Sequence, residues 1–322
     1  MHEFLKPLPC PEHLWTAASA ELWQSLYEPS PVGCDRLSLS SNLSFVLNKE
    51  PIPSCLGGFG RLAMVHAIYQ TTFDLRSAYA NPLMTDLTGI ASNGALTLRN
   101  WQTRTVELLE SLTPLEAPKT GQLTLLHHSP SWALQSNYMT TVHHVMLLNF
   151  TPIGDLFLFV SPSCEQIDRF RAKEILLQWV SQDEGQDARR AVLSACIIFT
   201  IIRLRPSQSF HEPIPFFMAT IAIWAYNHLV QPDIEATSST AGNDSFTLRL
   251  DQVSTSEEGR IWIQRDPGTV RGYLADVGSV HDHSAGKRLL VVAHQVLTNM
   301  HLWGPSRGFA AFLKALLEKH YH

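Results

Sequence analysis

The stretch RAVLSACIIFTIIRL (Arg190–Leu204) decides the fold of this chain, together with PIPFFMATIAIWAYNHLV (Pro213–Val230), which follows after eight intervening residues. Both stretches are apolar on nearly every face of a helix, a pattern typical of helices at the centre of a helical core. Pro206 and Pro213 favour a turn between them. The sequence therefore predicts an all-α, multi-helix globular domain with two central, nearly all-apolar helices.

The apolar parts of the two stretches are short for membrane spans. Ala191–Ile202 has twelve residues and Ile214–Tyr226 has thirteen, whereas a helix needs about twenty to cross the hydrocarbon of a bilayer. Charged residues border both parts, so we expect buried helices and no membrane partner. A membrane-associated helical protein stays the alternative interpretation.

Further helices are predicted on both sides of the central pair. Apolar residues recur at helical spacing in five more segments, which are 61–80, 95–112, 164–181, 287–303 and 305–319. Ser163, or another residue of the turn 161–163, is the expected N-cap of the helix at 164–181. The sequence contains no repeat of fixed period, and we expect one helical regulatory domain over residues 1–322.

Residues 231–260 differ in composition from the rest of the chain. They contain six acidic and two basic residues, within a net charge of -5 for the whole chain. Their first part is rich in Ser, Thr and Gly, which is typical of a mobile loop. We expect an acidic, mobile loop within the helical domain.

The charge of the chain does not favour binding of nucleic acid by its own surface. Charged residues make up 16% of the sequence, whereas phosphate recognition needs clustered Lys and Arg. The nearest basic clusters are Arg189 with Arg190 and Arg203 with Arg205, which we interpret as helix-end charges facing water. We therefore expect no direct sequence-specific DNA binding.

The five cysteines give no zinc site of the finger or cluster type. They stand at 10, 34, 55, 164 and 196 and form no C-x-x-C pair, the spacing that such sites use. Their odd number fits a reducing compartment, with Cys196 as a small buried hydrophobe. We expect no metal and no bound cofactor.

One motif of serine hydrolases occurs by letter. Gly304–Gly308 reads G-x-S-x-G around Ser306, but a nucleophile elbow follows a strand and is followed in the chain by an acid and then a histidine. Only sixteen residues follow Ser306, and Glu318 and His320 lie within or just past one predicted helix. We interpret Ser306 as part of a helix's first turn and expect no catalytic residue.

The histidine pairs and the glycine-rich segment give no further site. His127–His128, His143–His144 and His281–His283 lack the H-E-x-x-H spacing that places two imidazoles on one helical face. Asp282, between the histidines of the third group, adds a carboxylate, but a metal would need a ligand from another segment. Gly57–Gly60 lacks the dinucleotide-binding fingerprint, and we interpret it as a flexible helix entry.

Several short segments together resemble the fungal-specific transcription factor domain, also called the middle homology region. This domain is the large helical regulatory part of fungal regulators that carry a binuclear zinc cluster or two zinc fingers. The segments that carry the resemblance are Leu8–Cys10, Leu14–Ala17 with Trp23, Leu125–His128, Ala188–Arg203, His211–Leu229 and Trp303–Phe309.

The resemblance implies an all-α fold, action in the nucleus or the cytoplasm, and control of transcription, often of metabolic or biosynthetic genes. It implies partners among the transcription machinery or a DNA-binding regulator, and a small-molecule effector. Since Met1 lies almost directly before the Leu8–Cys10 segment and no zinc ligands are present, we expect a C-terminal fragment, a truncated product or a stand-alone regulator that works through a partner.

An alternative function is a helical enzyme or a small-molecule-binding protein of a biosynthetic pathway. Its natural site would be a cavity between the apolar helices, lined by Phe216, Phe217, Trp224 and Tyr226. Aromatic residues at such positions also fit a plain hydrophobic core. The sequence therefore leaves cofactor-binding residues unknown.

Overall fold

The computed structural model describes residues 14, 17–26, 38–39, 43–44, 48, 50, 56–80, 91–112, 132–181, 185–204, 206, 210–230, 246–253, 256–264, 270–300 and 304–321. By their internal contacts, residues 1–117 and residues 118–322 form two compact units, which are described separately below.

The first unit contains an antiparallel pair of long helices. Its described helices are α2 (Ala20–Leu26), α4 (Gly58–Ala80) and α6 (Ala91–Leu112). At one end of the pair, the Arg61 guanidinium on α4 donates to the Leu112 carbonyl oxygen on α6 at 2.8 Å. Further along, the Trp101 indole on α6 donates to the Thr72 hydroxyl on α4 at 2.9 Å. Buried Ile68 and Leu109 belong to the apolar contact between the two helices.

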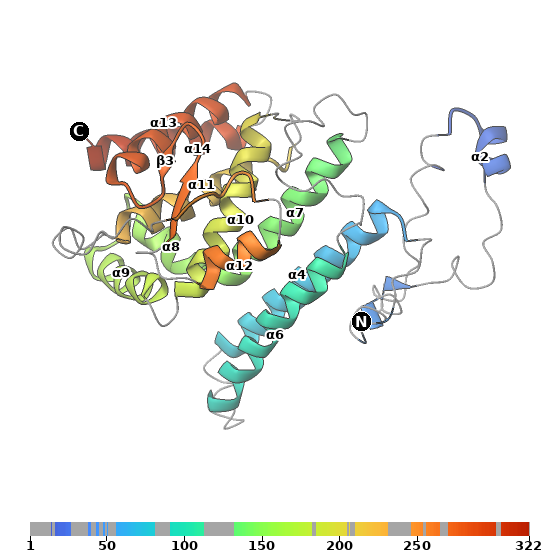
Figure 1. Cartoon of the computed structure of the whole chain (residues 1–322), viewed down its shortest axis with the longest axis horizontal. Coiled ribbons are helices and arrows are strands. Elements are labelled where there is room, and N and C mark those ends of the chain that lie inside the picture. The colour runs from blue at the N-terminus through green and yellow to red at the C-terminus, as the bar shows by residue number, and fades with distance from the viewer. Residues whose placement is uncertain are drawn as a thin grey trace. The chain divides into compact units, whose positions relative to one another are not determined.

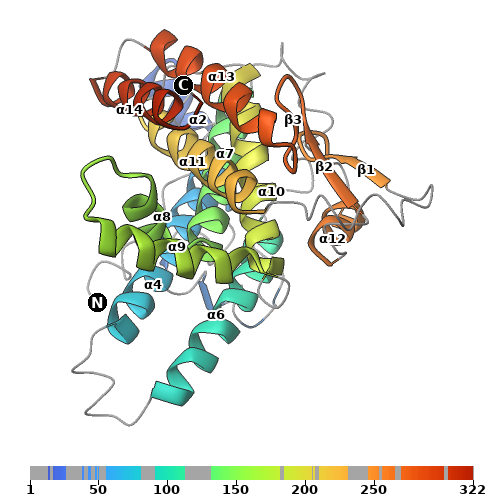
Figure 2. The same ribbon diagram turned by 90° about the vertical axis from the view of Figure 1, so that its left-hand side faces the viewer.

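The second unit is a helical bundle with a small sheet at one side (Figures 1 and 2). Its elements, in chain order, are α7 (Trp132–Phe150), α8 (Ile153–Val160), α9 (Gln166–Val180), α10 (Gly185–Leu204), α11 (Pro213–Leu229), β1 (Phe246–Arg249), α12 (Ser256–Gln264), β2 (Val270–Leu274), β3 (Gly278–Ser279), α13 (His283–Asn299) and α14 (Gly304–Tyr321). The mostly helical fold confirms the prediction, whereas the sheet was not expected.

Helices α10 and α11 lie at the centre of this unit, as predicted. Both are buried along most of their length, and they pack against each other while α10 also packs against α7 and α11 against α13. Phe199 on α10 and Phe216 on α11 stack with their ring centroids 5.1 Å apart. Phe217 stacks in turn on Phe309 of α14 at 4.4 Å. The apolar stretches therefore act as the core to which the other helices attach.

The N-cap expected for α9 is wrong. The helix begins after Glu165, whose side chain makes no capping hydrogen bond, while the hydroxyls of Ser161 and Ser163 contact each other at 3.2 Å. The Arg169 guanidinium instead donates to the Ser161 carbonyl oxygen at 2.8 Å and to that of Cys164 at 3.2 Å. An arginine from within the helix therefore holds the turn that a serine was expected to cap.

The sheet joins three short strands around α12. Strands β1 and β2 are parallel, with Phe246 opposite Val270, and β3 pairs antiparallel with β2. A methyl group at Gly272 would lie 2.6 Å from Leu250 and 2.8 Å from the Trp262 ring. Glycine at this position therefore allows α12 to pack directly on the sheet.

The range 231–260, expected as an acidic loop, contains β1 and the start of α12 in its second part; residues 231–245 lie outside the described residues. Asp251, one of its six acids, is buried and accepts two hydrogen bonds from Arg249, at 2.8 and 2.6 Å. At least one acidic side chain of this range is therefore buried in the fold and paired there.

Among the described residues, no single helix is both long and apolar enough to cross a membrane. The segments Ser136–Phe150 and Ile153–Val160 reach that length and composition only when they are taken together, across a bend of 85°.

Candidate functional site

Helix α12 is fixed to α10 by two reciprocal hydrogen bonds. The Trp262 indole donates to the Arg189 carbonyl oxygen at 2.9 Å, and Arg189 Nε donates to the Ile263 carbonyl oxygen at 2.8 Å. Trp262 is fully buried and the side chain of Arg189 is enclosed with it. This contact holds α12, which packs on the sheet, against α10.

The expectation that Arg189 faces water is wrong, because only 5% of this residue is exposed. Its neighbour Arg190 lies over the Phe150 ring at 5.6 Å, and Arg203 pairs with Asp276; Arg205 lies outside the described residues. No ion pair joins Arg189 to an acidic side chain of the described part of the chain. Among the described residues the buried Arg189 guanidinium therefore has no carboxylate partner, whereas buried charges are normally paired.

Three rings from separate elements meet beside Arg189. The ring of Tyr226 on α11 lies 6.4 Å from that of Trp262 and 5.9 Å from that of His281, which follows β3. The rings of Trp262 and His281 are 5.8 Å apart. Within the described ranges, the Tyr226 hydroxyl and both ring nitrogens of His281 are buried and have no hydrogen-bond partner. We call Arg189, Tyr226 and His281 the polar junction.

Burial sets the protonation of the two titratable rings. It raises the pKa of Tyr226 to about 12, against a smaller lowering by the charge of Arg189. Burial also lowers the pKa of His281 to about 4, and the charges of Arg271 and Arg189 add to this lowering. At neutral pH the tyrosine therefore keeps its proton and the histidine is uncharged, with one N–H donor and one acceptor nitrogen.

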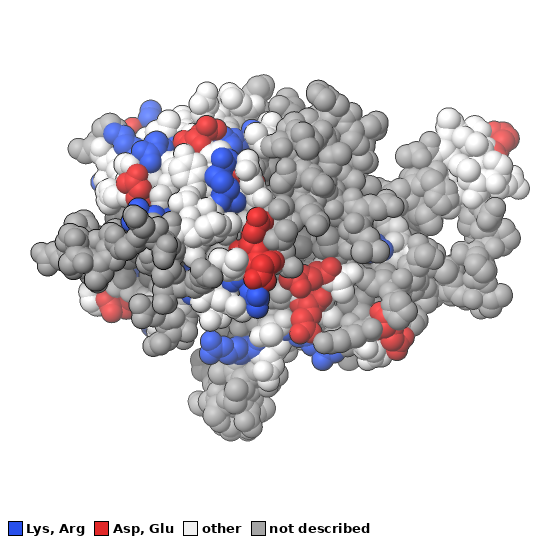
Figure 3. Space-filling model, viewed as in Figure 1, with Lys and Arg blue, Asp and Glu red and all other residues white. Residues whose placement is uncertain are grey.

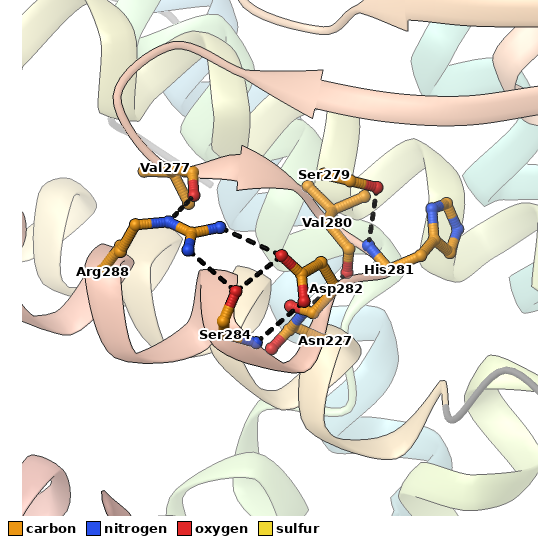
Figure 4. A network of polar contacts seen from close by, with 8 residues as sticks. All are labelled: Asn227, Val277, Ser279, Val280, His281, Asp282, Ser284 and Arg288. Carbon is orange, nitrogen blue, oxygen red and sulfur yellow. Dashed lines mark hydrogen bonds and ion pairs between the residues drawn. The ribbon is translucent and has the colours of Figure 1, made fainter.

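The backbone around His281 is held from both sides by α11. The side-chain amide of Asn227, next to Tyr226 in the chain, donates to the carbonyl oxygens of Val280 and Asp282 at 2.8 Å each. The backbone N–H of His281 donates to the Ser279 hydroxyl at 3.3 Å. Figure 4 shows the His281 ring pointing away from this network. The ring is therefore positioned by its backbone while its nitrogens stay unused.

Asp282 serves as the N-cap of α13. It accepts from the Ser284 backbone N–H at 3.0 Å and from the Ser284 hydroxyl at 2.6 Å, and these bonds lower its pKa. Arg288 donates to Asp282 at 3.1 Å and to the Val277 carbonyl oxygen at 2.5 Å (Figure 4). Gly278, at φ 110°, leaves room for this arginine, because a methyl group there would lie 2.6 Å from its Nη2.

The histidines considered as metal ligands lie apart or in helices. His281 faces Tyr226, whereas His283 faces Tyr321 with ring centroids 5.8 Å apart. His143 is partly buried on α7 with its Nδ1 3.5 Å from the Ser194 hydroxyl, and desolvation lowers its pKa to about 4. The described residues include no group of three His, Cys, Asp or Glu side chains that could hold a metal. His127 and His128 lie outside the described residues.

Ser306 lies in the first turn of α14, which confirms its interpretation as a helix-start residue. It is fully buried, and its hydroxyl donates to the Met300 carbonyl oxygen at 2.5 Å. His320 lies at the other end of the same helix, where its ring is 5.1 Å from that of His228. The serine hydroxyl and this histidine are therefore far apart along one rigid element.

The remaining residues considered from the sequence belong to helices of the core or of the first unit. Gly58 and Gly60 lie in the first turn of α4. The aromatic residues of the expected cavity are all buried in α11, namely Phe216, Phe217, Trp224 and Tyr226. Of these, Tyr226 alone belongs to the polar junction. The sequence predicts Tyr226 in a cavity or a core and Arg189 at the surface, and it gives no sign that either residue meets His281.

One curated protein, from Gibberella fujikuroi, aligns with nearly the whole chain. The two sequences are 26% identical over 302 residues, which is 94% of this chain and 34% of the relative. That relative is named a transcription factor. The chain therefore spans about a third of the length of the relative that it matches. No family model matches the chain, and no solved structure matches it.

Proposed function

We propose that this chain is the regulatory part of a transcription regulator and that it has no enzymatic activity. The observation that carries the proposal is the similarity to the Gibberella fujikuroi transcription factor over 94% of the chain. The helical architecture with a closed apolar centre at α10 and α11 agrees with a regulatory domain of the fungal-specific transcription factor class. The burial of Ser306 supports its interpretation as a helix-start residue over the hydrolase motif.

The proposal assigns DNA recognition to a partner or to sequence outside these 322 residues. The chain has a net charge of -5, and on the face drawn in Figure 3 acidic side chains lie among the basic ones. The described part of this face lacks the single-signed basic field that attracts the DNA backbone. The chain would act in the nucleus through contacts with other proteins of transcription, on metabolic or biosynthetic genes and under the control of a small-molecule effector.

A tethering assay tests the regulatory role. The chain is fused to a heterologous DNA-binding module and expressed in a fungal host with a reporter that carries the module's site. We expect reporter expression to differ clearly from that given by the module alone. A fusion that is present in the nucleus and folded but leaves the reporter unchanged would contradict the proposal.

A binding assay tests the proposal that the chain does not itself recognise DNA. The purified chain is titrated into labelled promoter fragments at physiological salt, with a shuffled fragment as the control. We expect equal, weak retention of both fragments, because non-specific contacts alone give only weak binding at that salt. Tight binding of the promoter over the shuffled control would show that the chain itself recognises bases.

A further inference from the structure

The polar junction has the composition of a binding site. We infer that Arg189, Tyr226 and His281 bind a small oxyanion, a carboxylate or phosphate group of a metabolite, as the effector of the regulator. The inference extends the proposed function, since it names the class of small molecule to which the regulatory part would respond.

The unused hydrogen-bonding groups are mainly donors. Within the described residues, the guanidinium of Arg189 makes one hydrogen bond, through its Nε, which leaves its two terminal nitrogens for a ligand. The Tyr226 hydroxyl and one nitrogen of His281 add donors that have no partner among the described residues. Guanidinium, hydroxyl and imidazole donors together match the oxygens of a carboxylate or a phosphate.

The charge at the junction also favours an anion. The positive charges of Arg189 and Arg271 both act on His281. Asp251 is the buried acid whose charge reaches Cys196 on α10, and its carboxylate is already held by Arg249 through two hydrogen bonds. The positive charge of Arg189 therefore remains available to a negatively charged ligand.

The three side chains are held in place by contacts that leave their polar tips free. The hydrogen bond to Ile263 fixes Arg189, and the two bonds from Asn227 fix the backbone on both sides of His281. Tyr226 is 1% exposed in the second half of α11. A core selected for stability alone would replace such an unpartnered hydroxyl with phenylalanine, because a buried group without a hydrogen bond is destabilising. A ligand oxygen at the junction would supply the partner that the Tyr226 hydroxyl lacks.

The direct test is binding of defined oxyanions to the purified 322-residue chain. Succinate, benzoate and inorganic phosphate are titrated separately by calorimetry, and the imidazole signals of His281 are followed by NMR. We expect at least one of the three to bind more tightly than about 1 mM and to shift the His281 signals. If none binds, or if binding leaves these signals unchanged, the inference is wrong. Comparison of benzoate and succinate with phosphate tells which oxyanion the junction prefers.

Two substitutions show whether binding uses the junction. Tyr226→Phe removes only a hydroxyl, and His281→Phe keeps a ring against Trp262 while removing both nitrogens. Each should weaken binding about tenfold to a hundredfold, the usual effect of losing a hydrogen bond to a charged group. Tyr273→Phe, on β2 outside the junction, is the matched control and should bind like the wild type. Affinity that is equal in all four proteins would overturn the inference.

A stability measurement separates a binding role from a structural one. Without ligand, Tyr226→Phe should unfold at the same or a higher temperature than the wild type, because it removes an unpartnered buried hydroxyl. A lower unfolding temperature would mean that the hydroxyl stabilises the core, and would contradict the inference. Since these assays use no promoter and no reporter, they can fail while the tethering assay succeeds, and the reverse also holds.

Discussion

The two halves of α11 (Pro213–Leu229) perform different tasks in one continuous helix. In the first half, Phe216 and Phe217 stack on rings of α10 and α14 and bring no polar atom that needs a partner. In the second half, Tyr226 and Asn227 carry polar atoms into the same core. The difference shows that burial alone does not define the role of a core helix, because a polar tip within it needs a partner from somewhere.

Two adjacent polar residues in the second half of α11 differ in their hydrogen bonds. The side-chain amide of Asn227 donates two hydrogen bonds to the carbonyl oxygens on either side of His281. The Tyr226 hydroxyl has no partner in the described part of the chain. Asn227 thus holds the backbone of the junction, although its own Oδ1 has no partner among the described residues, and the Tyr226 hydroxyl is left for a ligand.

Removal of a ring from the first half should have the largest effect. Phe216→Ala deletes a fully buried ring that stacks on Phe199 at 5.1 Å, and we expect the free energy of unfolding to fall by about 3–5 kcal/mol. Urea denaturation measures this loss. Ile214→Ala, on the same helix but 48% exposed, is the control and should change it by less than about 0.5 kcal/mol. Equal effects would mean that Phe216 is not part of the core.

Loss of the Asn227 amide should have the next largest effect. Asn227→Ala leaves the Val280 carbonyl oxygen without its donor, while that of Asp282 keeps the bond from the Ala285 backbone N–H at 2.8 Å. We expect a loss of about 2–3 kcal/mol in the free energy of unfolding, together with changed NMR signals for His281. Asn299→Ala, at the exposed end of α13, should leave both unchanged. If Asn227→Ala changed neither the free energy of unfolding nor the His281 signals, this would contradict the role of Asn227 in positioning His281.

A matched pair of glycines tests the packing of α12 on the sheet. Gly272→Ala would place a methyl group 2.6 Å from Leu250 and 2.8 Å from Trp262, so we expect it to destabilise the fold by about 1–3 kcal/mol. At Gly308, within α14, an added methyl group meets no atom within 4 Å. Gly308→Ala should therefore stabilise the helix by about 0.5–1 kcal/mol. Thermal unfolding measures both changes, and effects of the same sign would contradict the structure.

Acid should weaken the fold through its partly buried histidines. Burial lowers the pKa of His143 and of His228 from 6.5 to about 4, with His320 adding to the effect on His228. Between pH 4 and pH 6.5 these histidines bind protons in the unfolded chain but not in the folded chain. The free energy of unfolding is therefore highest above about pH 6.5 and falls as the pH approaches 4. His143→Gln should make this fall shallower in urea denaturation at a series of pH values. An unchanged slope would show that His143 does not take part.

The sequence predicted the apolar framework because its signal is local. The stretches at α10 and α11 are apolar on nearly every face, a pattern that has few solutions other than a buried helix. The start of α14 was also predictable, since Gly304 and Pro305 favour a helix entry. The sheet was missed because its strands have only four, five and two residues, too few for an alternating pattern to show.

The polar junction was not predictable because its members are distant in the chain. Arg189 and His281 are separated by 92 positions, and nothing local indicates that α12 and the sheet bring them together. Two weak signals were available, an arginine pair directly before an apolar helix and a tyrosine beside an asparagine within one. Both patterns also occur in ordinary core helices, so only the packed structure distinguishes them.

The division of α11 into a stabilising half and a sensing half is tested most directly by Tyr226→Phe in the tethered fusion. The measurement compares its reporter output and its free energy of unfolding with those of the wild type and of Tyr273→Phe. We predict unfolding free energy at or above the wild-type value and a changed reporter output for Tyr226→Phe alone. Reduced stability with unchanged reporter output would contradict the division.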